Sequence, residues 1–197
     1  FLKSINEIDL IAHRVVHGGE FVTEPGYVDN ELLKIIEDNI SLAPLHNNNN
    51  LLLIKACINH FKIPQIAVFD NENFHTVPEY NTIYPIQEKL RKKYHIRKYG
   101  FHGLYHYENT LKAVEFTGIP EEKINLISVH LGRGKSVAAI QNGKIIDSSC
   151  GFATLAGIPT IKRAGDIDAA VIIHLLEKSQ ISLPELKEML YKHSGLQ

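Results

Sequence analysis

The chain has 197 residues, of which 44% are hydrophobic and 22% are charged, and its formal net charge is −1. This composition is typical of a folded globular domain and excludes a disordered chain and a strongly basic nucleic-acid-binding arm. The longest apolar runs, at 51–54 and 169–173, are far shorter than the ~18 residues expected of a membrane span. Two cysteines favour a reducing compartment, so we expect a cytoplasmic protein that binds neither nucleic acid nor a membrane.

The first part of the chain alternates between strand and helix patterns. Residues 9–16 are apolar and β-branched, which predicts a buried strand that ends at a pair of glycines. Apolar residues at helical spacing predict a helix over 29–39, with Asp29 or Asn30 as its cap, and a second helix over 47–61.

The middle of the chain begins with a second strand. Residues 65–69 predict a short buried strand with Asp70 at its carboxyl end, and residues 71–84 are expected to be irregular. Helices are predicted over 85–94 and 103–116.

The last third changes to a strand, turn and strand pattern. Strands are predicted over 125–131 and 136–141, and Asn142-Gly143 is a strong hairpin signal before a returning strand at 144–149. Helices are predicted over 166–177 and 183–192. Gly118 and Pro120 lie in the break at 117–124, where we expect a domain boundary.

Arg14 lies inside the first predicted strand, where we expect its guanidinium to be buried. A buried guanidinium needs an anionic partner, so Arg14 is either half of a structural ion pair or a clamp for a carboxylate or phosphate. His13 and His17 flank it, but four residues of a regular strand span roughly 13 Å, so the two imidazoles are not expected to share a metal ion. The chain has 11 histidines, and their scatter also argues against a metal-binding protein.

Asp70 and His102 are two further candidates. Ligands of open α/β sheets bind beyond the carboxyl ends of strands, where Asp70 is expected; the alternative for Asp70 is a turn cap. His102 lies between Gly100 and Gly103, which permits a close approach of backbone to a ligand; the alternative is a structural histidine. His102 and His106 have the HxxxH spacing but lack the glutamate of a zinc protease motif.

Two basic segments complete the set. The turn His130-Leu131-Gly132-Arg133-Gly134-Lys135-Ser136 joins two predicted strands, and consecutive backbone N–H groups in such a turn can bind an anion. Arg163 precedes a helix whose first turn is acidic. It is either free to reach a ligand or paired with Asp166 or Asp168.

Taken together, six segments resemble the acetate kinase family. They are HRVVHGGE at 13–20, APLHN at 43–47, VFD…FH at 68–75, YGFHG at 99–103, HLGxGxSVAAIxNG at 130–143 and RxGDID at 163–168. The resemblance implies the α/β fold shared by actin, Hsp70 and sugar kinases, a ribonuclease H-like fold in which two related domains hold a nucleotide. Residues 1–120 would be the remainder of the first domain and residues 121–197 the beginning of the nucleotide-binding second domain.

The resemblance also implies the reaction, which is reversible, direct in-line phosphorylation of acetate by ATP to acetyl phosphate, with Mg²⁺. It implies a homodimer for the full-length parent. By position, it assigns Asp70, His102 and Arg163 to catalysis, and Asp70 is expected to orient the nucleophile or water around Mg²⁺. A general-base role is not expected, because a carboxylic acid with a pKa near ~4–5 is already ionised at neutral pH.

The same resemblance assigns the binding residues. Arg14 corresponds to the arginine that binds the substrate carboxylate or phosphate. A small pocket for the substrate methyl group is lined by Val16, Leu45 and Phe101. The loop for the ATP phosphates consists of His130, Leu131, Gly132, Arg133 and Gly134.

The sequence departs from the family pattern at several of these places. The family has Asn at Arg133, a small residue at Lys135, Gly-Thr at Ile161-Lys162 and a pocket proline at Thr154. The family's first phosphate loop and its C-terminal magnesium glutamate are not in the sequence. Two hypotheses follow: a segment of a working acetate kinase, or a truncated, inactive remnant with at most anion or nucleotide binding. We expect the 197-residue chain alone to be inactive.

Overall fold

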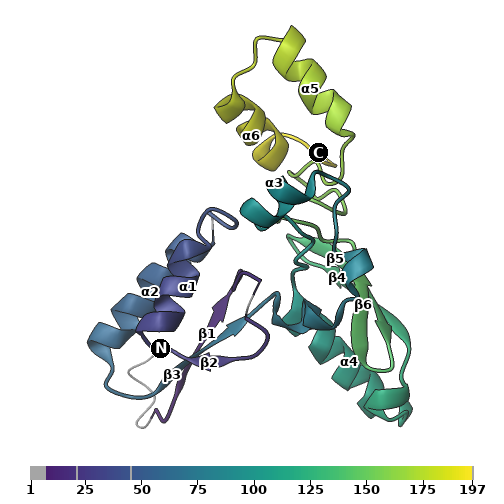
Figure 1. Cartoon of the computed structure of the whole chain (residues 1–197). Helices are drawn as coiled ribbons and strands as arrows, with labels where there is room; N and C mark the ends of the chain where they lie inside the picture. Colours follow the sequence, from purple (N-terminus) through teal and green to yellow (C-terminus); the bar gives the residue numbers. More distant parts are fainter. Residues whose placement is uncertain (1–7, 21, 45, 197) are drawn as a thin grey trace.

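The computed structural model describes residues 8–20, 22–44 and 46–196. The described residues form two three-stranded sheets with helices packed against each, and a pair of helices near the C-terminus (Figure 1). Each sheet has its own buried core, and the candidate residues lie where the two parts approach each other.

The first sheet contains β1 (Ile11–Val15), β2 (Gly26–Tyr27) and β3 (Gln65–Phe69) in the order β1-β3-β2. β1 is parallel to β3, and β2 is antiparallel to it. The parallel pair brings two carboxyl ends together, and the N–H of Asp70 continues the ladder by donating to the carbonyl of Val15 at 2.9 Å.

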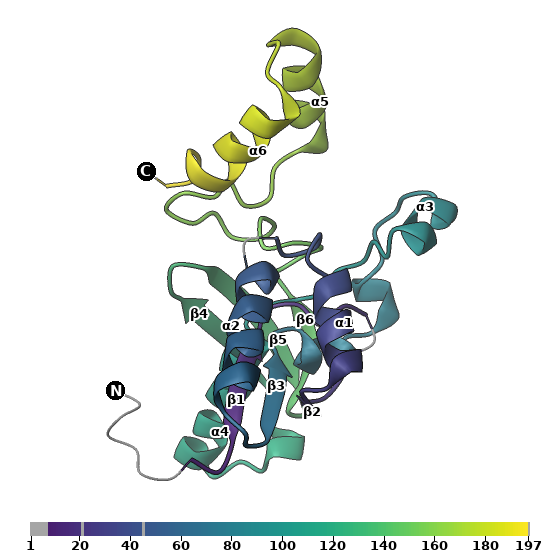
Figure 2. The same cartoon turned by 90° about the vertical axis from the view of Figure 1, so that its left-hand side faces the viewer.

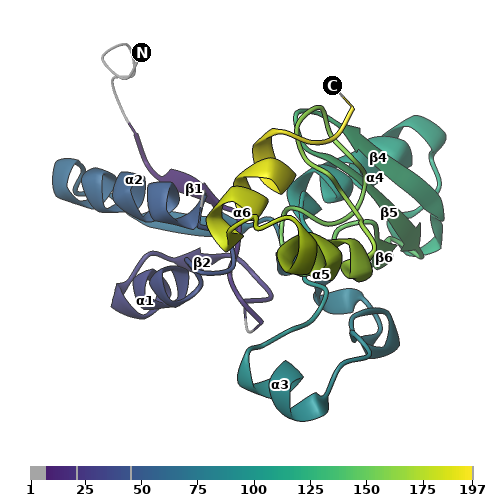
Figure 3. The same cartoon turned by 90° about the horizontal axis from the view of Figure 1, so that it is seen from above.

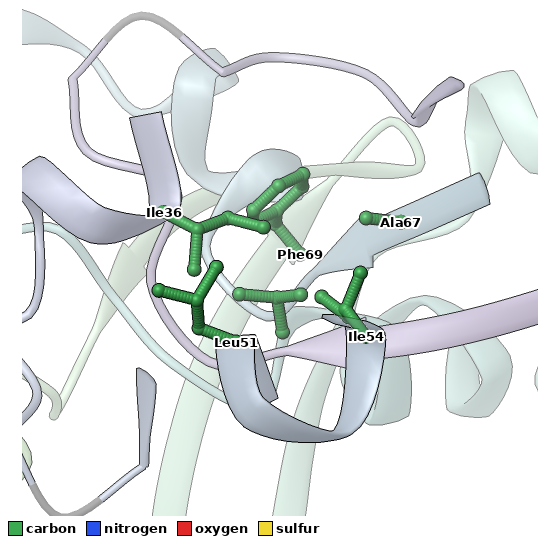
Figure 4. Close-up of a cluster of buried hydrophobic side chains, with 6 residues drawn as sticks. Ile36, Leu51, Ile54, Ala67 and Phe69 are labelled. Carbon is green, nitrogen blue, oxygen red and sulfur yellow. The ribbon is translucent and has the colours of Figure 1, made fainter. Parts of the chain in front are cut away.

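Helices α1 (Asn30–Asp38) and α2 (Asn47–His60) cover one face of this sheet (Figure 2). Their apolar stripes meet alternate residues of β1 and β3 because side chains alternate between the two faces of a strand. The core consists of Val15, Ile36, Leu51, Ile54, Ala67 and Phe69, each at most 5% exposed (Figure 4). Asp29 caps α1, since its carboxylate accepts a hydrogen bond from the N–H of Leu32.

The second sheet contains β4 (Leu126–Leu131), β5 (Lys135–Gln141) and β6 (Lys144–Ser148), all antiparallel in the order β4-β5-β6. Asn142 and Gly143 join β5 to β6 with φ of 52° and 73°, as the hairpin signal predicts. α4 (Gly103–Thr117) packs against β4, and the 3-10 helix at Glu72–Thr76 packs against β6. Phe74 of that 3-10 helix enters the core of this sheet.

Three helices lie outside these two layers: α3 (Glu88–Lys93), α5 (Ala169–Lys178) and α6 (Leu183–Lys192). Figures 1 and 2 show α5 and α6 at one end of the molecule, and Figure 3, which looks down on that end, shows them nearest the viewer. The side chain of Asp168 caps α5, and a reciprocal Ser182–Glu185 capping box begins α6. No helix of the described part is long and apolar enough to cross a bilayer.

Most predicted elements are confirmed to within a few residues, and two expectations are wrong. The helix predicted over 85–94 forms only at Glu88–Lys93, because Gln87 is extended with ψ of 124°. The first strand is not buried throughout, since the exposure of successive side chains alternates along β1 and only Val15 is fully buried. β2 was not predicted. The division into 1–120 and 121–197 stays a prediction.

Candidate active site

Arg14 and Asp70 form a bidentate ion pair at the carboxyl ends of β1 and β3. The Arg14 guanidinium donates from Nε at 2.8 Å and from Nη2 at 2.5 Å to the two carboxylate oxygens. The Arg14 side chain is 48% exposed whereas that of Asp70 is 1% exposed, so the expected burial of this guanidinium is wrong. Arg14 alternates with Val15 on β1 and therefore lies on the face that α1 and α2 leave uncovered.

Asp70 is fixed by its backbone on both sides. Its N–H is bound to Val15, and its carbonyl accepts a hydrogen bond of 2.7 Å from the N–H of Gly103, at the start of α4. A Cβ atom at position 103 would overlap the Asp70 carbonyl oxygen, which explains a glycine there. Burial raises the pKa of the Asp70 carboxyl, and the hydrogen bonds and charge of Arg14 oppose this shift. With both oxygens bound to a guanidinium, we assign Asp70 as the ionised partner of Arg14 at neutral pH.

His102 occupies the N-cap position of α4 with a left-handed backbone (φ 61°). Its Nδ1 lies 3.0 Å from the hydroxyl of Ser136 on β5, and its ring lies tilted by 42° against that of His130, with centroids 4.4 Å apart. Burial, reinforced by the charges of neighbouring histidines and arginines, lowers the pKa of His102 to about 4. His102 is therefore neutral at pH 7, with one N–H to donate.

The glycine turn between β4 and β5 lies against His102. A Cβ atom at Gly134 would be 2.9 Å from Cε1 of His102, so a side chain there would displace the imidazole. Arg133, Gly134 and Lys135 line the same cavity as His102, and Nζ of Lys135 donates to the Pro159 carbonyl at 3.5 Å. His130, Leu131 and Gly132 do not line the cavity within the described residues, and Leu131 is 76% exposed.

Arg163 reaches the cavity from the segment before α5. Its Nη1 donates to the Thr154 carbonyl at 3.1 Å, and its backbone N–H donates to the Thr160 hydroxyl at 3.0 Å. In the part of the chain that the structure describes, it forms no ion pair with Asp166 or Asp168. Those carboxylates accept from the backbone N–H groups of Gly157 and Ala170 instead.

These groups share one cavity of about 490 Å³. Arg14, Asp70, His102 and Arg163 line it together, although they are up to 149 positions apart along the chain. Its lining includes the cationic side chains of Arg14, Arg133, Lys135, Lys162 and Arg163, and Asp70 is its one carboxylate among the described residues. An excess of guanidinium and ammonium groups around a concave site favours a multiply charged anion.

One part of the cavity wall is apolar. Val16, Phe101 and Cys150 line it and belong to one cluster of buried side chains. Leu45, the third residue expected at the methyl pocket, lies outside the described residues. Thr154, which stands at a proline position of the family pattern, also lines the cavity. The other positions that depart from that pattern, Arg133, Lys135, Ile161 and Lys162, line it as well.

Several cavity residues were not predicted as site residues, and His46 and Tyr191 are two polar examples. His46 precedes α2, and its Nδ1 is buried without a hydrogen-bond partner among the described residues. Burial and the charges of Arg163 and Arg14 lower the pKa of His46. The signal that could have identified it is its place in the APLHN segment. Tyr191 enters from α6, and no local pattern marks it.

The family of the chain follows from comparison with known proteins. The model of the acetokinase family matches residues 1–197. The chain belongs to the acetokinase family. Among curated relatives it is 42% identical over 196 residues to an acetate kinase of Caldanaerobacter subterraneus subsp. tengcongensis and 45% identical over 196 residues to one of Thermoanaerobacterium thermosaccharolyticum. These alignments cover 99% of the chain and 49% of each relative, so the chain spans about half of their length.

Solved structures confirm the expected fold. A Porphyromonas gingivalis acetate kinase superposes with a TM-score of 0.90 at 37% identity and covers 98% of this chain and 49% of its own. A Francisella tularensis propionate kinase superposes with a TM-score of 0.94 at 37% identity, over 98% and 50% of the two chains. The two sheets are therefore part of the actin-like and Hsp70-like fold of this family, as the sequence resemblance implies.

Proposed function

We propose that this chain carries the substrate side of a phosphotransfer site that reversibly moves a phosphoryl group between ATP and acetate. The observation that carries the proposal is the convergence of Arg14, Asp70, His102 and Arg163 on one cationic cavity with a partly apolar wall. A carboxylate and its acyl phosphate have the same needs, because both present oxygens to a planar fork and a short alkyl group to an apolar surface.

Phosphoryl transfer places charge on three equatorial oxygens, so catalysis depends mainly on positioning and cationic stabilisation. In the proposed reaction, Arg14 and Arg163 hold the oxygens of the transferring group, and His102 donates its remaining N–H to them. Val16 and Phe101 contact the methyl group, and the bulk of Val16 favours acetate over propionate. Asp70 removes no proton; it orients the Arg14 guanidinium through both of its hydrogen bonds.

The residues present suit phosphate better than a metal ion. The turn at 133–135 offers a guanidinium, an ammonium and close backbone to a polyphosphate chain. Mg²⁺ prefers carboxylate and water oxygens in an octahedron, but both Asp70 oxygens are bound to Arg14. No group of three or more His, Cys, Asp or Glu side chains in the described ranges is placed to hold a metal ion. We therefore assign no step to Mg²⁺ in this chain.

We further propose that the 197-residue chain binds acetyl phosphate and does not turn over by itself. Calorimetry with acetyl phosphate, beside a hydroxamate assay with ATP and acetate, tests both halves of this statement. The expected result is binding without hydroxamate formation, with affinity about 10- to 150-fold lower in Arg163→Gln, because a hydrogen bond to a charged group contributes about 1.5–3 kcal/mol.

Lys144→Gln, on the exposed first position of β6, is the matched control and should bind like the parent chain. Hydroxamate formation would show that the half-length chain is active and would refute the proposal that it does not turn over by itself. Failure to bind acetyl phosphate, or equal losses in Arg163→Gln and Lys144→Gln, would refute the proposed site.

A further inference from the structure

A buried row of imidazoles and hydroxyls leads from the interface between α4 and β4 to the candidate active site. The hydroxyl of Ser136 lies 3.0 Å from Nδ1 of His102 and 2.8 Å from Nε2 of His106. Nδ1 of His106 lies 2.8 Å from the hydroxyl of Ser128, which accepts a hydrogen bond of 2.9 Å from Nδ2 of Asn109. Ser136 and His106 are fully buried and Ser128 is 2% exposed, so these bonds are shielded from bulk water.

The amide at the outer end gives the row a direction. Nδ2 of Asn109 is a donor only, so the proton of the Ser128 hydroxyl must be donated elsewhere. The other atom in contact with this hydroxyl, among the residues described, is Nδ1 of His106. A buried hydroxyl proton without an acceptor would cost about 1–3 kcal/mol, so Ser128 donates to Nδ1 of His106.

The next two hydrogen bonds of the row have the same direction. A neutral His106 whose Nδ1 accepts carries its proton on Nε2 and donates it to Ser136. Ser136 then has its own proton left for Nδ1 of His102. We infer that Ser136 and His106 are positioning residues that hold His102 in the tautomer protonated at Nε2, with that N–H available to a ligand in the cavity.

Two observations support the inference. Burial lowers the pKa of both His102 and His106 to about 4, so each ring has a single proton at pH 7 and the row can run in one direction. Within the described residues, Nε2 of His102 has no protein hydrogen-bond partner, and it is the side of the ring that lies against Gly134 at the cavity wall. A donor fixed there is already oriented before a phosphoryl oxygen arrives, which is the condition for electrostatic catalysis.

The inference rests on the proposed function only for what the His102 N–H contacts. The tautomer itself can be measured on the chain without turnover, by nitrogen-15 NMR of histidine side chains at pH 7.5, with His102→Gln used to assign the signals. The expected spectrum has Nε2 of His102 protonated and Nδ1 accepting. A His102 protonated at Nδ1 in the parent chain would overturn the inference.

Variants test the direction of the row. Asn109→Asp replaces the donor by an acceptor at an exposed position, so the Ser128 proton turns outward and His102 should change to the Nδ1-protonated tautomer. Ser136→Ala should leave His102 without a preferred tautomer. The matched control is Thr110→Val, which removes a buried hydroxyl bound to the His106 carbonyl and not to a ring nitrogen, and it should leave the spectrum unchanged.

An unchanged His102 tautomer in Asn109→Asp would refute the proposed direction of the row of hydrogen bonds, and so would an equal change in Thr110→Val. Acetyl phosphate affinity of the same proteins separates the two proposals. If the parent has the expected tautomer but binds no acetyl phosphate, the inference about the His102 tautomer is supported and the proposed function is refuted. If Asn109→Asp changes the tautomer and weakens acetyl phosphate binding several-fold, both are supported.

Discussion

His17 makes the stability of the chain depend on pH in a way that can be calculated. The side chain is fully buried, its Nδ1 accepts the N–H of Gly19 at 3.0 Å, and its ring packs edge-on against Tyr99 and Phe101. Burial lowers the pKa of His17 from 6.5 to about 4. The unfolded chain therefore takes up the proton first, and the free energy of unfolding falls as the pH falls from 6.5 toward 4.

The magnitude follows from the two pKa values. One pKa unit corresponds to about 1.4 kcal/mol, and at pH 5 the unfolded histidine is almost fully protonated whereas the buried one is not. His17 should therefore lower the free energy of unfolding by about 2 kcal/mol between pH 7.5 and pH 5. His17→Asn keeps an acceptor near Nδ1 but cannot titrate. It should be less stable than the parent at pH 7.5, because it leaves a cavity, and should lose about 2 kcal/mol less on acidification.

Urea unfolding followed by circular dichroism at pH 7.5, 6 and 5 measures this difference. His102 and His106 titrate alike in both proteins, so their contributions cancel in the comparison. The control is His174→Gln, at an exposed position of α5. Its free energy of unfolding should differ from that of the parent by the same amount at all three pH values. A constant gap between parent and His17→Asn at all three pH values would refute the reasoning.

Three further outcomes are expected. Gly103→Ala places a methyl group against the Asp70 carbonyl, so it should lower the free energy of unfolding by about 1–3 kcal/mol and weaken acetyl phosphate binding. The control is Gly118→Ala, whose methyl group would lie in open space. It should be less stable because of its positive φ but should still bind acetyl phosphate. Asp168→Ala removes the cap of α5 and should cost about 1 kcal/mol in urea unfolding; a change below a few tenths would contradict the capping role. Arg14→Lys loses the two-pronged bond to Asp70 and should weaken acetyl phosphate binding at least ten-fold by calorimetry; unchanged affinity would contradict the clamp.

Local patterns predicted the elements best where a periodic apolar stripe is bounded by a proline or a helix-capping residue. β3 and α6 have the predicted bounds, because Pro64 precedes the first and a serine cap starts the second. β2 has two residues and no periodicity, so nothing in the sequence marks it. The exposure of Arg14 was mispredicted because an apolar run does not reveal which face of the strand is covered.

The candidate site was only partly accessible from the sequence. The resemblance named Arg14, Asp70, His102 and Arg163 and implied one shared pocket, whereas the other residues that line it come only from the folded chain. The two histidines of the HxxxH spacing both contact the hydroxyl of Ser136, which comes from a strand 30 positions after His106. Tyr191 approaches from a helix whose sequence shows only amphipathic character, and its place depends on how α6 packs.

A double-mutant cycle between Arg14 and Arg163, read by calorimetry with acetyl phosphate, tests most directly whether both guanidinium groups hold one anion. We predict that Arg14→Gln and Arg163→Gln each weaken binding. The double variant should lose far less than the sum of the two free-energy losses, because removing either guanidinium already weakens the hold of the other on the same anion. Strictly additive losses, or unchanged affinity in either single variant, would contradict a shared site.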